Sequence, residues 1–126
     1  MVAKVGGTRV LVLALAAILV LRLPLAAGAV MTNGITSPKD GATVSGEVEV
    51  KGYASDPSFW KWQLDLLPGG GPNAAIFLAL GEQAGEFSHM LDTMGLPNGD
   101  HAFRLRVVRT DSNYDEYVST FTIANK

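Results

Sequence analysis

Residues 101–123 read HAFRLRVVRTDSNYDEYVSTFTI, and this stretch carries the clearest sign of a β fold. In its first nine residues, apolar side chains occupy every second position: Phe103, Leu105 and Val107. A period of two is typical of a strand with one face buried. Asp111-Ser112-Asn113 reads as a loop, and residues 117–123 return with Phe121 and Ile123 on the inner face. The stretch therefore predicts an antiparallel hairpin.

The same period of two occurs in three segments closer to the N-terminus, at residues 46–54, 59–66 and 86–92. The alternation predicts the following inner side chains: Val48, Val50, Ala54, Trp60, Trp62, Leu64, Leu66, Phe87, His89 and Leu91. Residues 75–80, AIFLAL, are apolar on both faces, which predicts either a central strand or a short buried turn.

Segments rich in glycine and proline separate these runs, at residues 37–41, 67–73 and 96–100. Proline fixes φ, and glycine or asparagine adopts positive φ, so such segments are typical of turns. Several short strands with turns at short intervals predict an all-β fold class. The expected architecture is a single two-sheet sandwich of about seven antiparallel strands.

The composition excludes several classes of function. The chain has 126 residues, no cysteine and a formal charge of −2. Without cysteine there is no disulfide scaffold, thiolate zinc site or cysteine nucleophile. A slightly acidic chain lacks the basic surface that nucleic-acid binding requires, so no nucleic-acid partner is expected.

The first 29 residues differ from the rest of the chain. Two basic residues precede an unbroken apolar run at residues 10–21, and Pro24 is followed by small residues. This order is typical of a secretory signal peptide, in which an apolar helix precedes a cleavage site between small residues. We therefore predict a leader over residues 1–29 and a sandwich domain over residues 30–126.

An uncleaved membrane anchor is the alternative. Residues 10–30 are long enough to span a bilayer of about 30 Å. Arg22 would then lie in the hydrocarbon, which is costly, and Pro24 would break the helix. Either outcome places the C-terminal part outside the cytoplasm, with a membrane contact only if the N-terminal segment is retained.

Residues 35–54 read ITSPKDGATVSGEVEVKGYA, and residues 91–125 read LDTMGLPNGDHAFRLRVVRTDSNYDEYVSTFTIAN. The first segment resembles the opening, and the second the closing half, of bacterial immunoglobulin-like and fibronectin-III-like domains. The resemblance implies an immunoglobulin-like sandwich in a secreted, surface-associated protein. Such domains usually act as spacers, adhesive units or appendages to enzymes, so the resemblance implies no chemistry.

One position departs from this family. The corner usually held by tyrosine is His101 here. The tyrosine of such corners donates a hydrogen bond to a backbone carbonyl a few residues upstream. A histidine ring N–H can donate to the same carbonyl, so we expect His101 to be a partly buried structural residue and neither a metal ligand nor a base.

No catalytic residue and no cofactor are predicted, and we expect the protein not to be an enzyme. Ser88 and His89 are neighbours that would point to opposite faces of a strand. Glu82 and Glu86 are explained as a solvated hairpin flank. The chain also lacks the motifs of serine hydrolases, metalloproteases and phosphate loops.

Three aromatic residues are candidates for ligand contact: Tyr53, Phe59 and Trp60. Exposed rings of this kind form a platform on which sugars stack. Trp62 is expected in the core, like the buried tryptophan of immunoglobulin folds.

Charged residues in the C-terminal hairpin have two interpretations. Asp111, Asn113 and Asp115 occupy alternate positions, as in the first half of a calcium loop. The glycine and the distant glutamate that finish such a loop are missing, so these residues are weak metal candidates and no bound metal is predicted. Arg104 and Arg106 are expected on the outer face, paired with acidic neighbours.

These observations predict an exported, non-enzymatic module with a structural or protein-interaction role at the cell envelope. Two alternatives stay open. One is a small carbohydrate-binding module that uses exposed aromatics on a cell-wall polysaccharide, and the other is a membrane-anchored accessory subunit of an envelope complex.

Overall fold

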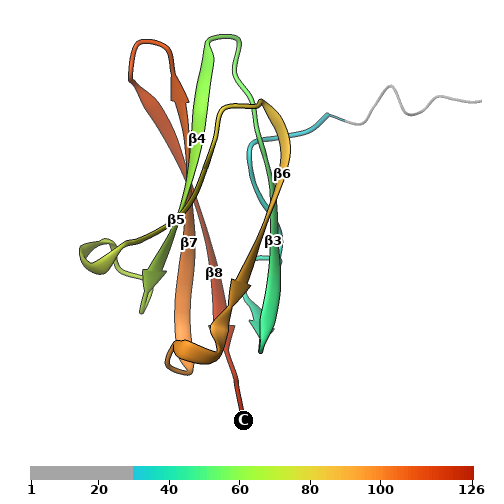
Figure 1. Ribbon diagram of the computed structural model, residues 1–126, viewed down its shortest axis with the longest axis vertical. Coiled ribbons are helices and arrows are strands. Elements are labelled where there is room, and N and C mark those ends of the chain that lie inside the picture. Colours follow the sequence, from blue (N-terminus) through green and yellow to red (C-terminus); the bar gives the residue numbers. More distant parts are fainter. Residues whose placement is uncertain (1–29) are drawn as a thin grey trace, which may run out of the picture. The chain divides into compact units, whose positions relative to one another are not determined.

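The two sheets of this protein face each other across one apolar core (Figure 1). The computed structural model describes residues 30–126. The predicted leader of residues 1–29, with its apolar helix or anchor, lies outside the described residues. Within residues 30–126, no helix is long and apolar enough to cross a membrane.

Eight strands were found in this range: β1 Gly34–Ser37, β2 Ala42–Val44, β3 Glu47–Ala54, β4 Phe59–Pro68, β5 Ile76–Gly81, β6 Gly85–Asp92, β7 Gly99–Arg109 and β8 Tyr114–Ile123. Two short 3-10 turns, η3 Pro72–Ala74 and η4 Thr93–Gly95, follow β4 and β6. One sheet has the order β1-β3-β6, and the other has the order β2-β8-β7-β4-β5. The predicted all-β two-sheet sandwich is therefore confirmed.

The strand count and the strand directions differ from the prediction of about seven antiparallel strands. There are eight strands in the described range, and β2 runs parallel to β8, with Ala42 opposite Phe121. Strands β1 and β2 lie outside the six segments predicted from the sequence; they are four and three residues long and flank the turn at residues 38–41. Strands this short cannot display a period of two, so the sequence pattern did not reveal them.

The predicted C-terminal hairpin is confirmed as β7 and β8. Ten residue pairs join these strands, from Gly99 opposite Ile123 to Val108 opposite Tyr114. The turn is shorter than expected, because β8 already begins at Tyr114. Ser112 adopts a positive φ of 73° in this turn.

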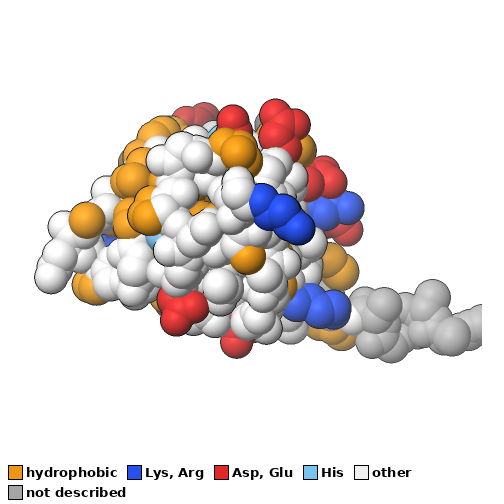
Figure 2. Space-filling model, turned by 90° about the horizontal axis from the view of Figure 1, so that it is seen from below, with side chains coloured by type: hydrophobic (Ala, Val, Ile, Leu, Met, Phe, Trp, Pro, Cys, Tyr) orange, Lys and Arg blue, Asp and Glu red, His pale blue; other side chains and the backbone are white. Residues whose placement is uncertain are grey.

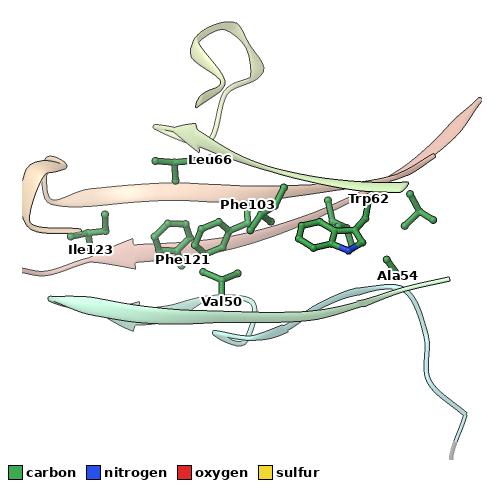
Figure 3. Packing of buried hydrophobic residues seen from close by; sticks show 10 residues of the cluster. Val50, Ala54, Trp62, Leu66, Phe103, Phe121 and Ile123 are labelled. Atoms are coloured by element: carbon green, nitrogen blue, oxygen red, sulfur yellow. The ribbon is translucent and has the colours of Figure 1, made fainter. Parts of the chain in front are cut away.

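The core confirms most of the inner side chains that the alternation predicts. In Figure 3, Val50 of β3 points towards Phe103 and Phe121, whose rings stack with centroids 4.3 Å apart and planes 9° apart. Trp62 of β4 stacks on Phe87 of β6 at 4.3 Å, which joins the two sheets. Burial of each such side chain contributes about 1.5–3 kcal/mol.

Trp60 contradicts the simple alternation. Its exposed fraction is 42%, although a strict period of two placed it inside with Trp62. A bulge is the cause: Phe59 lies opposite Arg109 and Lys61 opposite Val108, so Trp60 is an additional residue in β4. One inserted residue reverses the faces on one side of the bulge. Phe59 therefore packs against the core instead, and Trp60 points outwards.

The apolar run at residues 75–80 forms neither a central strand nor a buried turn. It forms β5, which pairs with β4 and lies at the end of its sheet. Apolar residues on both faces are typical of a central strand, but here several of them face solvent. Position in the sheet depends on the whole strand order, which periodicity within one segment does not report.

Candidate functional site

Two cross-strand rows of side chains form the outer surface of the five-stranded sheet. The first row is Leu80, Gln63, Arg106 and Glu116, and the second is Phe77, Asp65, Arg104 and Val118. Each row takes one residue from β5, β4, β7 and β8 in turn. These residues alternate with the core residues of the same strands, so their side chains share the outer face. We call these eight residues the β5–β8 face.

An ion pair between Asp65 and Arg104 forms the centre of the β5–β8 face. Both Nε and Nη2 of Arg104 donate to Oδ2 of Asp65, at 3.2 and 2.9 Å. Nε2 of Gln63 donates to both carboxylate oxygens of Asp65, at 3.0 and 3.2 Å. Asp65 is only 2% exposed, and the side chain of Arg104 is 12% exposed. The carboxylate is therefore held in one orientation by three donor groups.

A second, more exposed ion pair lies in the neighbouring row. Nε of Arg106 donates to Oε2 of Glu116 at 2.6 Å, and the guanidinium of Arg106 lies 4.6 Å from the ring centroid of Tyr114. The two arginines predicted on the outer face thus pair with acids of the adjacent strands. Solvent screens this exposed pair, so its contribution to stability is small.

Apolar side chains border the charged centre on both sides. Phe77 and Leu80 of β5 and Val118 of β8 are large and exposed. Figure 2 shows hydrophobic side chains gathered towards the side on which β5 and the β4–β5 connection lie in Figure 1. Exposed apolar groups around an arginine are typical of protein interaction surfaces.

The three aromatic residues predicted for ligand contact do not share a surface. Tyr53 lies on the outer face of β3, opposite Glu86 of β6 in the three-stranded sheet. Trp60 lies in the five-stranded sheet, and Nζ of Lys61 lies 4.1 Å from its ring centroid. Phe59 packs against the core. These three rings therefore form no common stacking platform.

His101 is buried, with an exposed fraction of 3%, at the start of β7. Its Nδ1 accepts a hydrogen bond from the backbone N–H of Gly69 at 3.3 Å, so Nε2 carries the proton and donates to the carbonyl of Pro97 at 2.8 Å. The bond to Pro97, four residues upstream, is the type expected from the corner resemblance. The bond from Gly69 was not expected, because it depends on where the β4–β5 connection begins in space.

A cleft of about 340 Å³ lies beside His101, lined by Gly41, Gly69, Gly70, Asp100, His101, Thr120, Phe121 and Thr122. Its polar side chains bond to other groups of the protein. Oγ1 of Thr122 donates to Asp100 at 2.9 Å, and the N–H and Oγ1 of Thr120 donate to Asp40 at 2.7 and 2.9 Å. The hydrogen bond from the backbone N–H of Thr120 is the main cause of a lowered pKa of Asp40, and the bond from the Thr120 hydroxyl lowers it further.

The weak metal candidates are bonded to other protein groups. Asp111 accepts hydrogen bonds from the backbone N–H and the side-chain Nδ2 of Asn113, at 2.9 and 3.0 Å. The backbone bond is the main cause of the lowered pKa of Asp111. Asp115 pairs with Arg109 at 2.8 Å. Among residues 30–126, no three histidine, aspartate or glutamate side chains are grouped as a metal would require.

The alternation that predicts Trp62 and Leu64 on the inner side of their strand implies that Gln63 and Asp65 lie on its outer side, but it assigns them no role. The signal that marks them is a match between strands: a polar strand face (Lys61, Gln63, Asp65) lies against another that carries Arg104 and Arg106. That match becomes visible only once β4 is known to pair with β7, because the two strands are distant in sequence.

Comparison with known proteins shows likeness in structure only. No protein-family model matches the chain, and no curated protein matches it. Among solved structures, an endo-beta-1,4-mannanase from Thermotoga petrophila is similar with a TM-score of 0.60 and 19% identity, over 79% of this chain and 21% of the mannanase. The chain thus spans about a fifth of the length of that enzyme.

Two further structures are similar at lower scores. CopC from Methylosinus trichosporium OB3b has a TM-score of 0.46 and 18% identity, over 75% of this chain and 95% of its own. The PmoD soluble domain from Methylocystis sp. ATCC 49242 (Rockwell) has a TM-score of 0.49 and 13% identity, over 68% and 78%. At such identities the similarity to the mannanase shows the fold alone, and this chain is a two-sheet β-sandwich of three and five strands.

Proposed function

We propose that this protein is an exported, non-enzymatic module of immunoglobulin-like or fibronectin-III-like type, which binds another protein at the cell envelope through the β5–β8 face. The observation that carries the proposal is the combination on this face of exposed Phe77, Leu80 and Val118 with the shielded Asp65–Arg104 pair. Side chains of this kind make a surface for a partner and give no reacting group for catalysis.

The chemistry of the face favours a protein as the partner. Interfaces between proteins enclose apolar and aromatic groups at their centre, and arginine is enriched there. Arg104 is already held by Asp65, so binding would cost little side-chain entropy at this position. The apolar groups of β5 and β8 supply the area from which a partner would exclude water.

The likeness to the mannanase supports a role as a module. In that enzyme the similar region covers 21% of the chain, so a sandwich of this fold is part of a longer protein there. The sequence resemblance to bacterial surface domains implies the same kind of use, as a spacer, adhesive unit or appendage.

Site-specific photo-crosslinking in the native host tests the proposed interaction. A photoreactive residue in place of Val118 should yield a discrete protein adduct of defined mass. The matched control replaces Lys51, which is exposed on the outer face of the three-stranded sheet, and should yield none. Equal adducts at both positions, or none at position 118, would overturn the proposal.

Export is tested by the mass of the native protein. The order of charged, apolar and small residues in positions 1–29 predicts a mature chain that begins at Val30. A mass that begins at Met1 would instead support the membrane-anchored accessory subunit.

A polysaccharide partner is the less favoured alternative, because Tyr53 and Trp60 lie in different sheets and Phe59 packs inwards. We expect no retardation in gels that contain soluble polysaccharides. If the protein is retarded and the Trp60→Ala variant is not, the partner is a carbohydrate and the proposal of a protein partner is wrong.

A further inference from the structure

Strand β5 is an edge strand without the usual protection. It pairs with β4 on one side, and among the described residues no strand lies on its other side. Its sequence, IFLALG, contains no charge and no proline, and Ile76, Phe77 and Leu80 are 44%, 58% and 49% exposed. An apolar edge with unpaired backbone groups is a template for another strand.

The other edges in the described part of the chain carry protection that β5 lacks. The β6 edge presents the acids Glu86 and Asp92. The β8 edge presents Asp115 and Glu116, and β2 covers its end. Strands β1 and β2 have only four and three residues. Charges and short length both oppose pairing between chains, so the lack of both distinguishes β5.

The sequence of inner and outer side chains along β5 is the same whether the strand is followed from Ile76 to Gly81 or from Gly81 to Ile76. Ile76 and Gly81 lie opposite core residues of β4, and Leu78 and Ala79 both pack against the core. Phe77 and Leu80 lie opposite Asp65 and Gln63, on the outer face. The bulge at Leu78 creates two successive inner residues, so the strand reads inner, outer, inner, inner, outer, inner.

Because this order is symmetric, two antiparallel β5 strands can pair with inner residues opposite inner residues and outer residues opposite outer residues. With a two-fold axis midway between Leu78 and Ala79, Phe77 lies opposite the partner's Leu80 and Ile76 lies opposite the partner's Gly81. Every pair then shares one face, and two apolar cross-strand pairs, each of Phe77 with Leu80, form on the outer side. Cyclic two-fold pairing of this kind also closes, because each copy uses its β5 edge only once.

We propose that two copies of this chain associate by antiparallel pairing of their β5 strands, which continues the five-stranded sheet from one copy into the other. The inference rests on the proposed function, because it names a second copy as a partner at the β5 end of the β5–β8 face. Charge does not oppose the pairing: Glu82, the charge nearest to β5 in the sequence, would lie opposite the partner's Ala75.

The area that becomes buried sets the strength of association. Three half-exposed apolar side chains offer on the order of 300 Å² per copy, the size of a single surface patch. This is below the roughly 800 Å² per partner of stable complexes, so we expect a reversible dimer that forms at micromolar concentrations or above.

Sedimentation velocity of the purified full chain tests the dimer. Over about 5 to 500 μM, the range that a small interface requires, the weight-average sedimentation coefficient should rise. Phe77→Lys should weaken association at least tenfold, because it places a charge opposite an apolar side chain. Met90→Lys is the matched control, since Met90 is similarly exposed but lies in β6 of the three-stranded sheet, and it should associate like the parent chain.

Every variant in this experiment carries the same N-terminal segment, so differences between them arise from the substituted strand. Circular dichroism checks that each variant keeps its fold, which is expected because both positions are exposed. Equal association of the Phe77→Lys and Met90→Lys chains would overturn the proposal, and so would a parent chain that stays monomeric throughout.

Disulfide trapping tests the register, because the chain has no cysteine of its own. Under mild oxidation, a mixture of the Phe77→Cys and Leu80→Cys chains should form a crosslinked heterodimer. Either chain alone should not, since residue 77 in one copy would lie about 10 Å from residue 77 in the other, too far for a disulfide. Efficient crosslinking of a single variant with itself would overturn the register.

The two proposals fail in different ways. If the chain is monomeric but position 118 still crosslinks to a different protein, the proposed dimer is wrong and the proposed interaction role stands. If the chain is monomeric and position 118 gives no adduct, both proposals are wrong.

Discussion

His101 shows how one residue holds three parts of the sandwich together. Its ring joins β7 to Gly69 and to Pro97, and it lies 5.7 Å from the ring of Phe121. His101→Ala removes a buried ring and leaves the Pro97 carbonyl and the Gly69 N–H without their partner, so the free energy of unfolding should fall by about 2 kcal/mol. Urea titration followed by circular dichroism measures this change.

The matched control for His101 is the other histidine. His89 is only half-buried, on β6, and His89→Ala should cost less than half as much. Equal effects of the two substitutions would show that the hydrogen bonds of His101 contribute nothing to stability.

Asp65 is the residue on which the centre of the β5–β8 face depends. Asp65→Ala would leave the guanidinium of Arg104 shielded from water and without its carboxylate. Loss of one partner from a buried ion pair destabilises by about 3–5 kcal/mol, and the slight exposure of Arg104 places the expected loss near 3 kcal/mol.

Glu116→Ala removes the acid of the exposed pair with Arg106 and serves as the comparison for Asp65→Ala. Its cost should be below about 1 kcal/mol, since water solvates the released guanidinium. Both values come from the same denaturant titration. If the two substitutions cost the same, the shielding of Asp65 has no energetic consequence.

At the scale of elements, strand β5 is fitted to β4 through one glycine. A Cβ at Gly81 would lie 2.5 Å from atoms of the Trp62 indole, which is fixed by its stack on Phe87. Gly81→Ala should therefore lower the free energy of unfolding by about 1–3 kcal/mol and change the fluorescence of Trp62. Gly71→Ala, where a Cβ meets open space, should leave both unchanged.

A double-mutant cycle decides whether Trp62 is the cause. In a Trp62→Phe background, the smaller ring leaves room, so Gly81→Ala should cost at least 1 kcal/mol less, on the scale of measured coupling energies. Additive effects would mean that Gly81→Ala acts through the backbone of β5 and not through a clash with the Trp62 indole.

The connection between β1 and β2 is tied to β8 through a charge. Asp40 accepts hydrogen bonds from the backbone N–H and the hydroxyl of Thr120, and these bonds, the backbone one most, hold the pKa of Asp40 below its ordinary value of 3.8. A lowered pKa in the folded state stabilises the fold above that value, and the stabilisation disappears as the pH falls through the lower pKa. The melting temperature of Asp40→Asn should thus lie below that of the parent chain at pH 7, and the difference should shrink between about pH 5 and about pH 2. A difference that stays constant with pH would exclude this linkage.

At the scale of the whole molecule, the strands of the five-stranded sheet are expected to open unequally. β7 is paired along its length with both β4 and β8, and its inner residues Leu105 and Val107 are fully buried. β5 has one neighbour and several exposed side chains. Hydrogen exchange at low protein concentration should therefore be slowest in β7 and faster in β5. Equal protection of the two strands would contradict this order of stability.

The sequence by itself predicted the hairpin of β7 and β8, the turns and most of the core. These features follow from a local rule, because successive side chains of a strand point to opposite faces whatever lies beside the strand. The bond from His101 to Pro97, which the resemblance to immunoglobulin-like corners implied, is also local, since it spans four residues.

Only the tertiary structure decided which strands stand next to each other and where the register slips. Trp60 faces solvent because of a bulge against Arg109 and Val108, about fifty positions further along the chain. The edge position of β5, the parallel strand β2 and the shielding of Asp65 also depend on contacts between residues distant in sequence. A strand carries the same pattern of apolar residues in the middle of a sheet and at its edge, so the packing of the whole chain determines which of its residues remain free to bind.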